Sequence, residues 1–516
     1  MIVRIILLIA FFAVMIAVGI YSRNKTSDIN GFVLGGRSVG PWLSAFAYGT
    51  SYFSAVVFVG YAGQFGWKYG ISTTWIGIGN AVIGSLLAWV LMGRRTRVMT
   101  HHLDAKTMPD YFGKRYDSKT LKLVASAIVF VFLIPYTASV YTGLSKLFGM
   151  AFNIDYKWCV IAMAVLTAFY VILGGYMATV INDFIQGIVM IVGICCVIGA
   201  VLKGQGGFLS ALQKLSEVPV DPANTSPALL GMKGAFSSFF GPDPISLLGV
   251  IVLTSLGTWG LPQMVQKFYA IKSEKAVKTG TVVSTFFAII IAGGCYFLGG
   301  FGRLFDNASI HGAGGKILYD GIIPSMLSTL PDILLGVVVV LVLSASMSTL
   351  SSLVLTSSST LTLDFLKDSI FKKMTEKQTL RVMRSLVVFF IVVSVILAFN
   401  PPTFIAQLMG ISWGALAGAF LAPFLYGLFL KKVTKASVWA SFAFGVGLTV
   451  SNMFFKFFAS PINCGAWAMI GGLIIVPVVS LVTPKLNKEK VDSIFECYDE
   501  SVTVTKRVYL KEEEED

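Results

Sequence analysis

The stretch LSASMSTLSSLVLTSSSTLTLD, residues 343–364, is long enough to cross a membrane, yet hydroxyl groups crowd it. An unpaired polar group that faces lipid costs several kcal/mol, so these side chains must face protein or a cavity. Ser348, Ser351 and Ser352 follow i, i+3, i+4 spacing and share one helical face, which Thr349 borders. This face offers the hard, neutral oxygens that a dehydrated sodium ion needs. The alternative is that small hydroxyl residues only let two helices approach closely.

The composition is that of a polytopic helical membrane protein. Of the 516 residues, 55% are hydrophobic and only 13% are charged, which excludes an ordinary soluble domain. The six cysteines lie mostly in apolar segments without framework spacing, so we expect them to pack rather than to form disulfides or bind metal. The formal net charge of +14 fits basic residues gathered on the cytoplasmic side better than nucleic-acid binding.

Apolar segments predict about thirteen transmembrane helices, each near the length that a bilayer requires. These segments are residues 2–21, 42–64, 73–92, 121–148, 158–175, 181–202, 245–265, 282–301, 333–363, 382–399, 404–430, 437–455 and 466–482. With the N-terminus outside and the C-terminus inside, about 30 of the 40 Lys and Arg residues lie on the cytoplasmic side. The loop 93–122 is the richest of these basic segments. We therefore expect a multi-pass protein of the plasma membrane. Its compact loops and short tail suggest a bacterial inner membrane.

The second and seventh predicted spans carry interruptions. AFAYGTSYFS at residues 45–54 places Gly49 among small and polar residues in mid-span, and GTWGLP at residues 257–262 places two glycines and a proline there. Unwound backbone is tolerated in a membrane only where it is buried in protein or lines a cavity. Interruptions five helices apart match two five-helix halves of opposite topology, residues 42–202 and 245–430. For each interruption, the alternative is a kink that serves only packing.

The remaining segments lie outside this repeat. Residues 1–22 are expected to form a first transmembrane helix, and residues 437–482 two peripheral helices. Residues 483–516 are polar and end in EEEED, which predicts a solvated, acidic cytoplasmic tail.

Several motifs resemble those of the sodium/solute symporter family, whose members carry proline, sugars, sialic acid, pantothenate and other small solutes. These motifs are FVLGGRSVGPW at 32–42, GTSYFSA at 49–55, PDYFGKRY at 109–116, YVILGGYMATVINDFIQG at 170–187 and SASMSTLSS at 344–352. The similarity runs from about Phe32 to Leu430 and is greatest to the proline-carrier branch. It implies an all-α, LeuT-type fold with a 5+5 inverted repeat. It also implies sodium-coupled uptake of a small organic solute by alternating access.

The resemblance further implies binding sites for one or two sodium ions. The first site would combine the main-chain oxygens of Ala47, Thr50 and Ala345 with the hydroxyls of Ser348 and Thr349. The second would combine Asp183 with the hydroxyls of Ser348, Ser351 and Ser352. An ionisable group in a span is by default a functional candidate. The alternative role of Asp183 is that of a helix cap, since it stands in what the pattern predicts to be an opening helical turn.

The solute site is less closely matched to the proline carriers. Tyr136 matches a substrate-site tyrosine of the family, and we place the solute beside a set of four residues, Tyr136, Gln64, Trp259 and Thr258. Proline carriers have an aspartate where this chain has Gly49, and their seventh-helix aromatics fall on Thr254 and Thr258. We expect an amino acid such as proline or a small carboxylate. A sugar or sialic acid is the alternative, although the second and third spans lack the carboxylate that sugar carriers use.

A passive channel or a membrane sensor would be a function of another class. A channel needs a ring of like residues around an axis, which an inverted repeat does not offer. A sensor needs a fused output domain, for which about thirty tail residues are too few. The sequence therefore predicts a transporter rather than an enzyme, without catalytic residues or nucleic-acid partners, and with a small solute, sodium and the lipid bilayer as its partners.

Overall fold

The computed structural model describes residues 2–23, 28–152, 155–221 and 229–498, and within them the fold is built from helices. The helices in the first half of the described chain are α1 (Ile2–Ser22), α2 (Ile29–Leu34), α3 (Pro41–Tyr52), α4 (Ala62–Tyr69), α5 (Thr74–Gly79), α6 (Arg94–His102), α7 (Met108–Arg115), α8 (Lys119–Phe152), α9 (Tyr156–Gly204) and α10 (Phe208–Ser216). The later helices are α11 (Pro244–Gly260), α12 (Pro262–Ala270), α13 (Glu274–Ala288), α14 (Gly294–Gly299), α15 (Ile322–Ser328), α16 (Asp332–Thr360), α17 (Glu376–Phe399), α18 (Ile405–Phe429), α19 (Lys435–Phe455), α20 (Pro461–Val482) and α21 (Lys488–Phe495). Several are continued by π-helical segments, which are Val56–Tyr61, Asn80–Leu87, Trp89–Gly93, Ile289–Gly293 and Leu361–Ile370.

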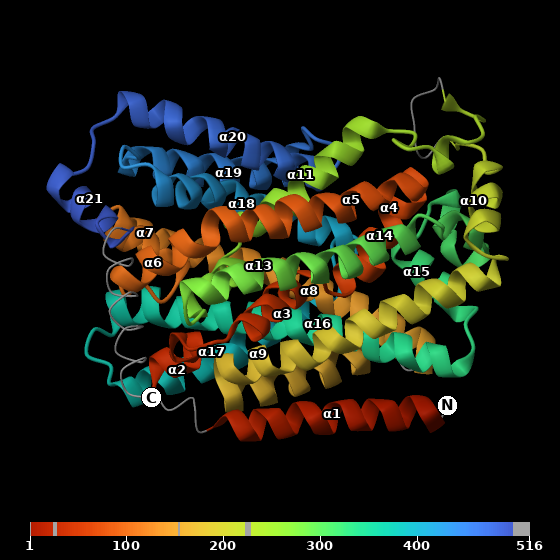
Figure 1. Cartoon of the computed structure of the whole chain (residues 1–516), viewed down its shortest axis with the longest axis horizontal. Helices are drawn as coiled ribbons and strands as arrows, with labels where there is room; N and C mark the ends of the chain where they lie inside the picture. The colour runs from red at the N-terminus through yellow and green to blue at the C-terminus, as the bar shows by residue number, and fades with distance from the viewer. Residues whose placement is uncertain (1, 24–27, 153–154, 222–228, 499–516) are drawn as a thin grey trace.

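The long helices run roughly side by side and form one elongated bundle (Figure 1). α1 begins at the same end as α10 and α15, whereas α6, α7 and α21 lie at the opposite end. α3 and α16 lie against each other near the middle of the bundle, and both also contact α9. The peripheral pair α19 and α20 packs on α18. α3 and α16 thus carry all five residues of the predicted first sodium site.

Ten helices among the described residues are long and apolar enough to cross a membrane, or up to eleven if the bent pair α11 and α12 forms one span. This number is smaller than the predicted thirteen because the structure joins some apolar segments into continuous helices. α9, for instance, contains both of the predicted spans 158–175 and 181–202. If straight, its 49 residues would measure about 73 Å, more than twice the hydrocarbon thickness of a bilayer. The helix instead bends at Gly175, whose φ of 49° and ψ of −145° suit only glycine.

Both predicted interruptions are present. α3 ends at Tyr52 because Phe53 adopts extended backbone, with φ −93° and ψ 101°, before the chain becomes helical again. Gly49 itself lies inside α3, so the break falls a turn later than the glycine suggested. The second break is at Leu261, where α11 and α12 meet at 45° and Pro262 cannot donate to the preceding turn. A main-chain bridge between Val39 and the Ala270–Lys272 segment joins the regions that flank the two broken helices.

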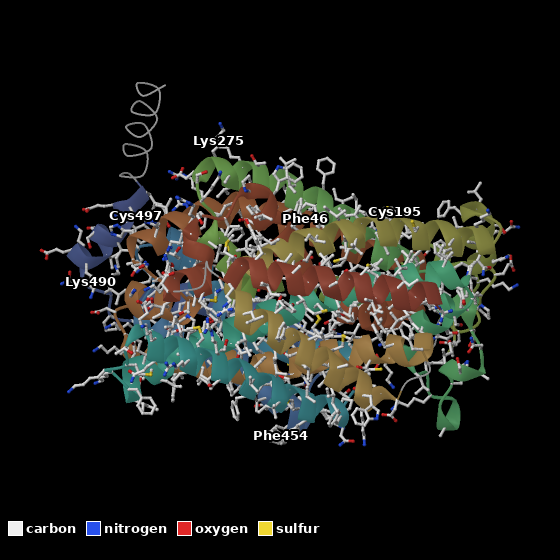
Figure 2. The ribbon with its side chains drawn as sticks, turned by 90° about the horizontal axis from the view of Figure 1, so that it is seen from below. Phe46, Cys195, Lys275, Phe454, Lys490 and Cys497 are labelled. Carbon is white, nitrogen blue, oxygen red and sulfur yellow. The ribbon has the colours of Figure 1, made fainter. Side chains whose placement is uncertain are left out.

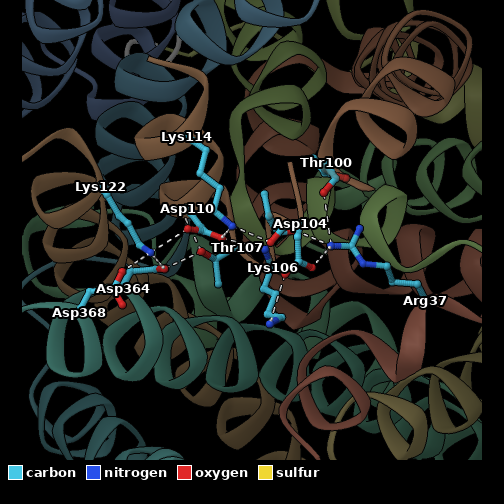
Figure 3. Close-up of polar contacts among 11 residues, drawn as sticks. Arg37, Thr100, Asp104, Lys106, Thr107, Asp110, Lys114, Lys122, Asp364 and Asp368 are labelled. Atoms are coloured by element: carbon cyan, nitrogen blue, oxygen red, sulfur yellow. Dashed lines mark hydrogen bonds and ion pairs between the residues drawn. The ribbon is translucent and has the colours of Figure 1, made fainter. Parts of the chain in front are cut away.

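Ion pairs fix the end of the bundle at which α6 and α7 lie (Figure 3). The ammonium of Lys122 lies 2.7 Å from Asp110 Oδ1 and 3.4 Å from Asp364 Oδ1. Burial alone would raise the pKa of Asp110, but Lys122 and Lys114 outweigh that effect and hold this pKa below its ordinary value. Because Asp364 belongs to the π-helical continuation of α16, these pairs anchor the end of α16 to α7 and α8.

The start of the predicted tail is folded rather than solvated. α21 buries Val491, Ile494 and Phe495, and Lys490 pairs with Asp117 at 2.7 Å. Figure 2 shows Lys490 and Cys497 together at this end of the molecule. The amphipathic spacing of the three apolar side chains explains the docking, since a helix with one apolar face is stable only when it covers that face. The acidic residues 499–516 lie outside the described residues.

The close approach of α4 to α14 predicts a large effect of one methyl group. A Cβ placed at Gly66 of α4 would lie 1.8 Å from the carbonyl oxygen of Gly299 in α14. We expect Gly66→Ala to destabilise the purified protein by about 2 kcal/mol, because neither backbone can move without repacking. The measurement is thermal unfolding in detergent. Gly199→Ala in α9 is the matched control, because a Cβ there meets nothing within 4 Å and alanine favours the helix. Equal melting temperatures for the two variants would contradict this packing.

Candidate functional site

The hydroxyl face of α16 contacts the main chain of α3. Ser348 Oγ and Thr349 Oγ1 each lie 3.1 Å from the carbonyl oxygen of Thr50. The same two hydroxyls also donate to the carbonyl of Ala345, at 3.0 and 3.1 Å. All of these residues are buried. The structure therefore brings together the predicted first-site oxygens of Thr50, Ala345, Ser348 and Thr349, and the hydroxyls do more than permit close packing.

The break in α3 explains why the Thr50 carbonyl faces a second helix. In an uninterrupted α-helix this carbonyl would accept from the N–H of Ser54, four residues later. The chain leaves the helix at Phe53, and the carbonyl of Ser54 starts a new helical turn by accepting from Val57 and Phe58 at 3.0 Å. The last carbonyls of α3 are thus open to partners outside the helix. Ala47 lies one turn before Thr50, on the same face, and is fully buried.

The surroundings of Gly49 explain why this position holds a glycine and not the aspartate that proline carriers have there. A Cβ at this position would lie 2.3 Å from Cδ1 of Phe287, which projects from α13. The Phe287 ring also packs against Phe46 and Phe53, with centroid distances of 5.2 and 6.3 Å. An aromatic side chain therefore fills the space in which a carboxylate would stand, and the oxygens beside it are uncharged.

Asp183 lies inside α9, two turns beyond the bend at Gly175, and its side chain is fully buried. A helix cap lies at the end of a helix, so the alternative role as a cap is wrong. The other members of the predicted second site are only partly assembled around it. Ser351 donates to the carbonyl of Ser348 at 2.9 Å, within its own helix. Ser352 Oγ lies 2.8 Å from Ser51 Oγ of α3.

The sequence analysis missed a lysine in this region. Lys267 Nζ donates to Ser352 Oγ at 3.0 Å and lies 3.9 Å from Asp183 Oδ2. The seventh span was predicted to end at residue 265, which would leave Lys267 in a cytoplasmic loop, but α12 continues to Ala270 and keeps this lysine 1% exposed. The apolar residues Phe268, Tyr269 and Ala270 were the signal that the span continues past the charge.

Aromatic rings surround the break in α3. The Trp413 ring of α18 lies 5.4 Å from that of Tyr52 and 5.9 Å from that of Tyr136, centroid to centroid. Gly257 of α11 allows this approach, since a Cβ there would lie 2.6 Å from the Trp413 ring. Trp413 was not predicted, although a lone tryptophan among small residues, in GISWGALAG at residues 410–418, indicates a ring held against neighbouring backbones.

Some of the predicted solute-site residues have polar atoms that the protein does not use. Within the described part of the chain, the buried atoms Tyr136 Oη, Gln64 Oε1, Tyr61 Oη and Trp413 Nε1 have no hydrogen-bond partner. Such atoms are uncommon and call for a partner such as a solute or water. Trp259 and Thr258 differ: Trp259 Nε1 donates to the Ile83 carbonyl at 2.9 Å and Thr258 Oγ1 to the Gly84 carbonyl at 3.0 Å. Their polar atoms are engaged with the third predicted span.

A family model described as the sodium:solute symporter family matches residues 32–445 of this chain. The osmoregulated proline transporter OpuE of Bacillus subtilis (strain 168) is 27% identical over 502 residues, which cover 96% of this chain and 97% of the relative. The sodium/proline symporter of Staphylococcus aureus (strain JH9) is 30% identical over 507 residues, which cover 94% of this chain and 93% of the relative.

Solved structures share the fold. The substrate-bound, outward-open structure of a Na+-coupled sialic acid symporter superposes with a TM-score of 0.76 at 16% identity, covering 94% of this chain and 98% of that one. The closed conformation of Mhp1, a nucleobase-cation-symport-1 family transporter, superposes with a TM-score of 0.52 at 14% identity, covering 90% and 98%. The predicted all-helical, polytopic transporter fold is thereby confirmed. The count of thirteen spans, the orientation and the inverted repeat stay predictions.

The contact between Gly49 and Phe287 can be tested through its non-additivity. We expect Gly49→Ala to destabilise the protein by about 1 to 3 kcal/mol, because the new methyl group overlaps the Phe287 ring. Phe287→Leu should cost less than that when introduced alone. In the double variant the smaller side chain makes room for the methyl group. The double variant should therefore lose less stability than the sum of the two single losses. Strict additivity would show that the two residues do not touch.

Proposed function

The chain belongs to the sodium:solute symporter family, and we propose that this sodium-coupled symporter takes up a small zwitterionic amino acid of the proline type. The observation that carries the proposal is the contact between the broken helix α3 and α16. There, a main-chain carbonyl freed by the break lies 3.1 Å from two buried hydroxyls. The proline transporters and symporters among its relatives, with more than nine-tenths of each chain matched, support the choice of solute.

For the coupling ion, the first site would consist of five neutral oxygens, those of Ala47, Thr50, Ala345, Ser348 and Thr349. Sodium suits such a site because it is a hard cation that accepts several oxygen ligands in place of its water shell. The hydroxyls that now donate to the carbonyls of Thr50 and Ala345 would rotate and turn their lone pairs toward the ion. A second cation-binding position would lie at Asp183, with Ser348, Ser351 and Ser352 beside it. The number of ions per cycle is then one or two.

The solute would lie beside the break in α3, between Trp413, Tyr52 and Tyr136. The apolar part of an amino acid such as proline would pack on these rings, as is usual in small-molecule sites. Its carboxylate would accept from Tyr136 Oη or Trp413 Nε1, and its ammonium would donate to an acceptor such as Gln64 Oε1. These atoms are buried and have no partner in the described part of the protein, so a solute that satisfies them would bind favourably.

The topology proposed for this function is thirteen spans with the N-terminus outside and two inverted five-helix halves, residues 42–202 and 245–430. The breaks at Phe53 and Leu261, in the first helix of each half, support the repeat. The basic residues of α6 and α7 support a cytoplasmic position for their end of the bundle. In this arrangement an ion between α3 and α16 would hold the two helices together. Ion binding would therefore favour one state of the alternating-access cycle.

The direct test is uptake into proteoliposomes that contain the purified protein. With sodium outside, labelled proline should accumulate above its external concentration, and replacing sodium with choline should abolish the accumulation. Competition by unlabelled amino acids, small carboxylates and sialic acid would rank the solutes. Sodium-independent equilibration of the solute would contradict the proposed coupling.

Removing either hydroxyl from the first site should weaken sodium binding. We expect Ser348→Ala and Thr349→Ala each to raise the sodium concentration for half-maximal uptake roughly tenfold, since each removes a ligand of a charged group. Ser346→Ala is the matched control from the same helix, because Ser346 Oγ donates to the Val342 carbonyl of its own helix at 2.7 Å. A sodium dependence that changes as much in Ser346→Ala as in the two site variants would remove the assignment.

Removing the Tyr136 hydroxyl should affect solute binding without affecting stability. Because Tyr136 Oη has no partner among the described residues, Tyr136→Phe should leave the melting temperature unchanged and raise KM for proline roughly tenfold. Tyr116→Phe should do the reverse. Tyr116 Oη donates to the Pro423 carbonyl at 2.6 Å, at the end of the bundle, so its loss should cost about 1 kcal/mol of stability and leave KM unchanged.

A further inference from the structure

Lys267 and Asp183 form a buried pair of opposite charges. Each side chain is at most 1% exposed, and the ammonium nitrogen lies 3.9 Å from Asp183 Oδ2. In the part of the chain that the structure describes, this is the one ion pair that Asp183 makes. Charges are rare inside membrane proteins and persist when they are paired and functional.

The ammonium group stands among the very residues predicted to hold a second sodium ion. Lys267 Nζ donates to Ser352 Oγ at 3.0 Å and faces the Tyr176 ring at 5.1 Å from its centroid. Ser352 Oγ in turn lies 2.8 Å from Ser51 Oγ. A hydroxyl oxygen, a carboxylate and an aromatic face are all suitable partners for a cation. The ammonium therefore has the surroundings that a bound cation would require.

Charge balance decides between an ammonium and a metal ion. Asp183 with Lys267 is a neutral pair, so a sodium ion added beside them would leave an uncompensated positive charge in a buried region. With Lys267 absent, Asp183 would need another cation for the same reason. One cation at this position is favourable and two are not.

We propose that Lys267 is a resident cation that takes the place of a second sodium ion at Asp183, so that this symporter couples one sodium ion to each solute. The inference rests on the proposed sodium-coupled uptake and concerns its stoichiometry. Lys267 belongs to α12, the helix that follows the break at Leu261. Because its ammonium is part of the chain, this charge stays with the protein through the cycle. Ser51 and Ser352 join it to α3 and α16, which carry the first site. The ammonium would thus support the same helix contact as the coupling ion without being transported.

Counting bound sodium ions tests this inference without requiring transport. In equilibrium binding of radiolabelled sodium to the purified full-length protein, we expect about one ion per wild-type chain. Lys267→Met removes the ammonium and leaves Asp183 without a cationic partner. The number of sodium ions bound per chain should therefore rise toward two, and the Hill coefficient for sodium should rise with it. Lys267→Arg keeps a positive charge and should retain a count of one. The double variant Lys267→Met/Asp183→Asn has no buried charge left to balance and should also return to one.

The possible results separate the inference from the proposed function. Two sodium ions in the wild type would overturn the inference and leave sodium-coupled uptake intact. One ion in a folded Lys267→Met variant would also overturn it, because the vacated carboxylate should attract a cation. If Lys267→Met does not fold, the wild-type count and that of Lys267→Arg still decide. No bound sodium in the wild type would overturn the proposed function and the inference with it.

Discussion

The arrangement of this protein depends on the need to satisfy every main-chain polar group within a membrane. A helix can stop in mid-membrane only where another element supplies partners for the carbonyls that it exposes. α3 stops at Tyr52, and α16 supplies the hydroxyls of Ser348 and Thr349 to the carbonyl of Thr50. The row of hydroxyls in α16 and the break in α3 therefore require each other. The oxygens that stabilise the break are also those of the proposed ion site.

The buried charges obey a similar constraint. Asp183 lies in the interior of α9 and Lys267 in α12, and neither charge would be stable alone in these surroundings. The pair joins two helices from opposite halves of the chain, and Ser352 connects it to α16. At the end of the bundle, Lys122 pairs with both Asp110 and Asp364 and so compensates their charges. α16 and its continuation are thus held at two levels, by the hydrogen bond from Lys267 to Ser352 and by the ion pair of Lys122 with Asp364.

The aromatic residues would bring the proposed solute site next to the proposed ion site. Tyr52 is the last residue of α3, and its ring packs on Trp413, which in turn meets Tyr136 of α8. Thr50, two residues earlier, lies at the proposed ion site. A solute on these rings and an ion on α16 would therefore contact the same short segment of chain. This proximity would give a physical route for coupling, because each ligand would stabilise the conformation of the break that the other needs.

Much of the fold and part of the site could be predicted from the sequence. Hydropathy determined a polytopic helical protein, and the residue types in GTWGLP and SASMSTLSS indicated a broken helix and an oxygen-rich face, because backbone chemistry and side-chain spacing are local properties. The ring of Phe287 at Gly49 and the place of Trp413 were decided by tertiary structure, since each depends on a helix distant in sequence. Lys267 is the clearest case. The seventh span was predicted to end at residue 265, before this lysine, and only the approach of α9 and α16 brought Asp183 and Ser352 close enough to make burial of its charge favourable.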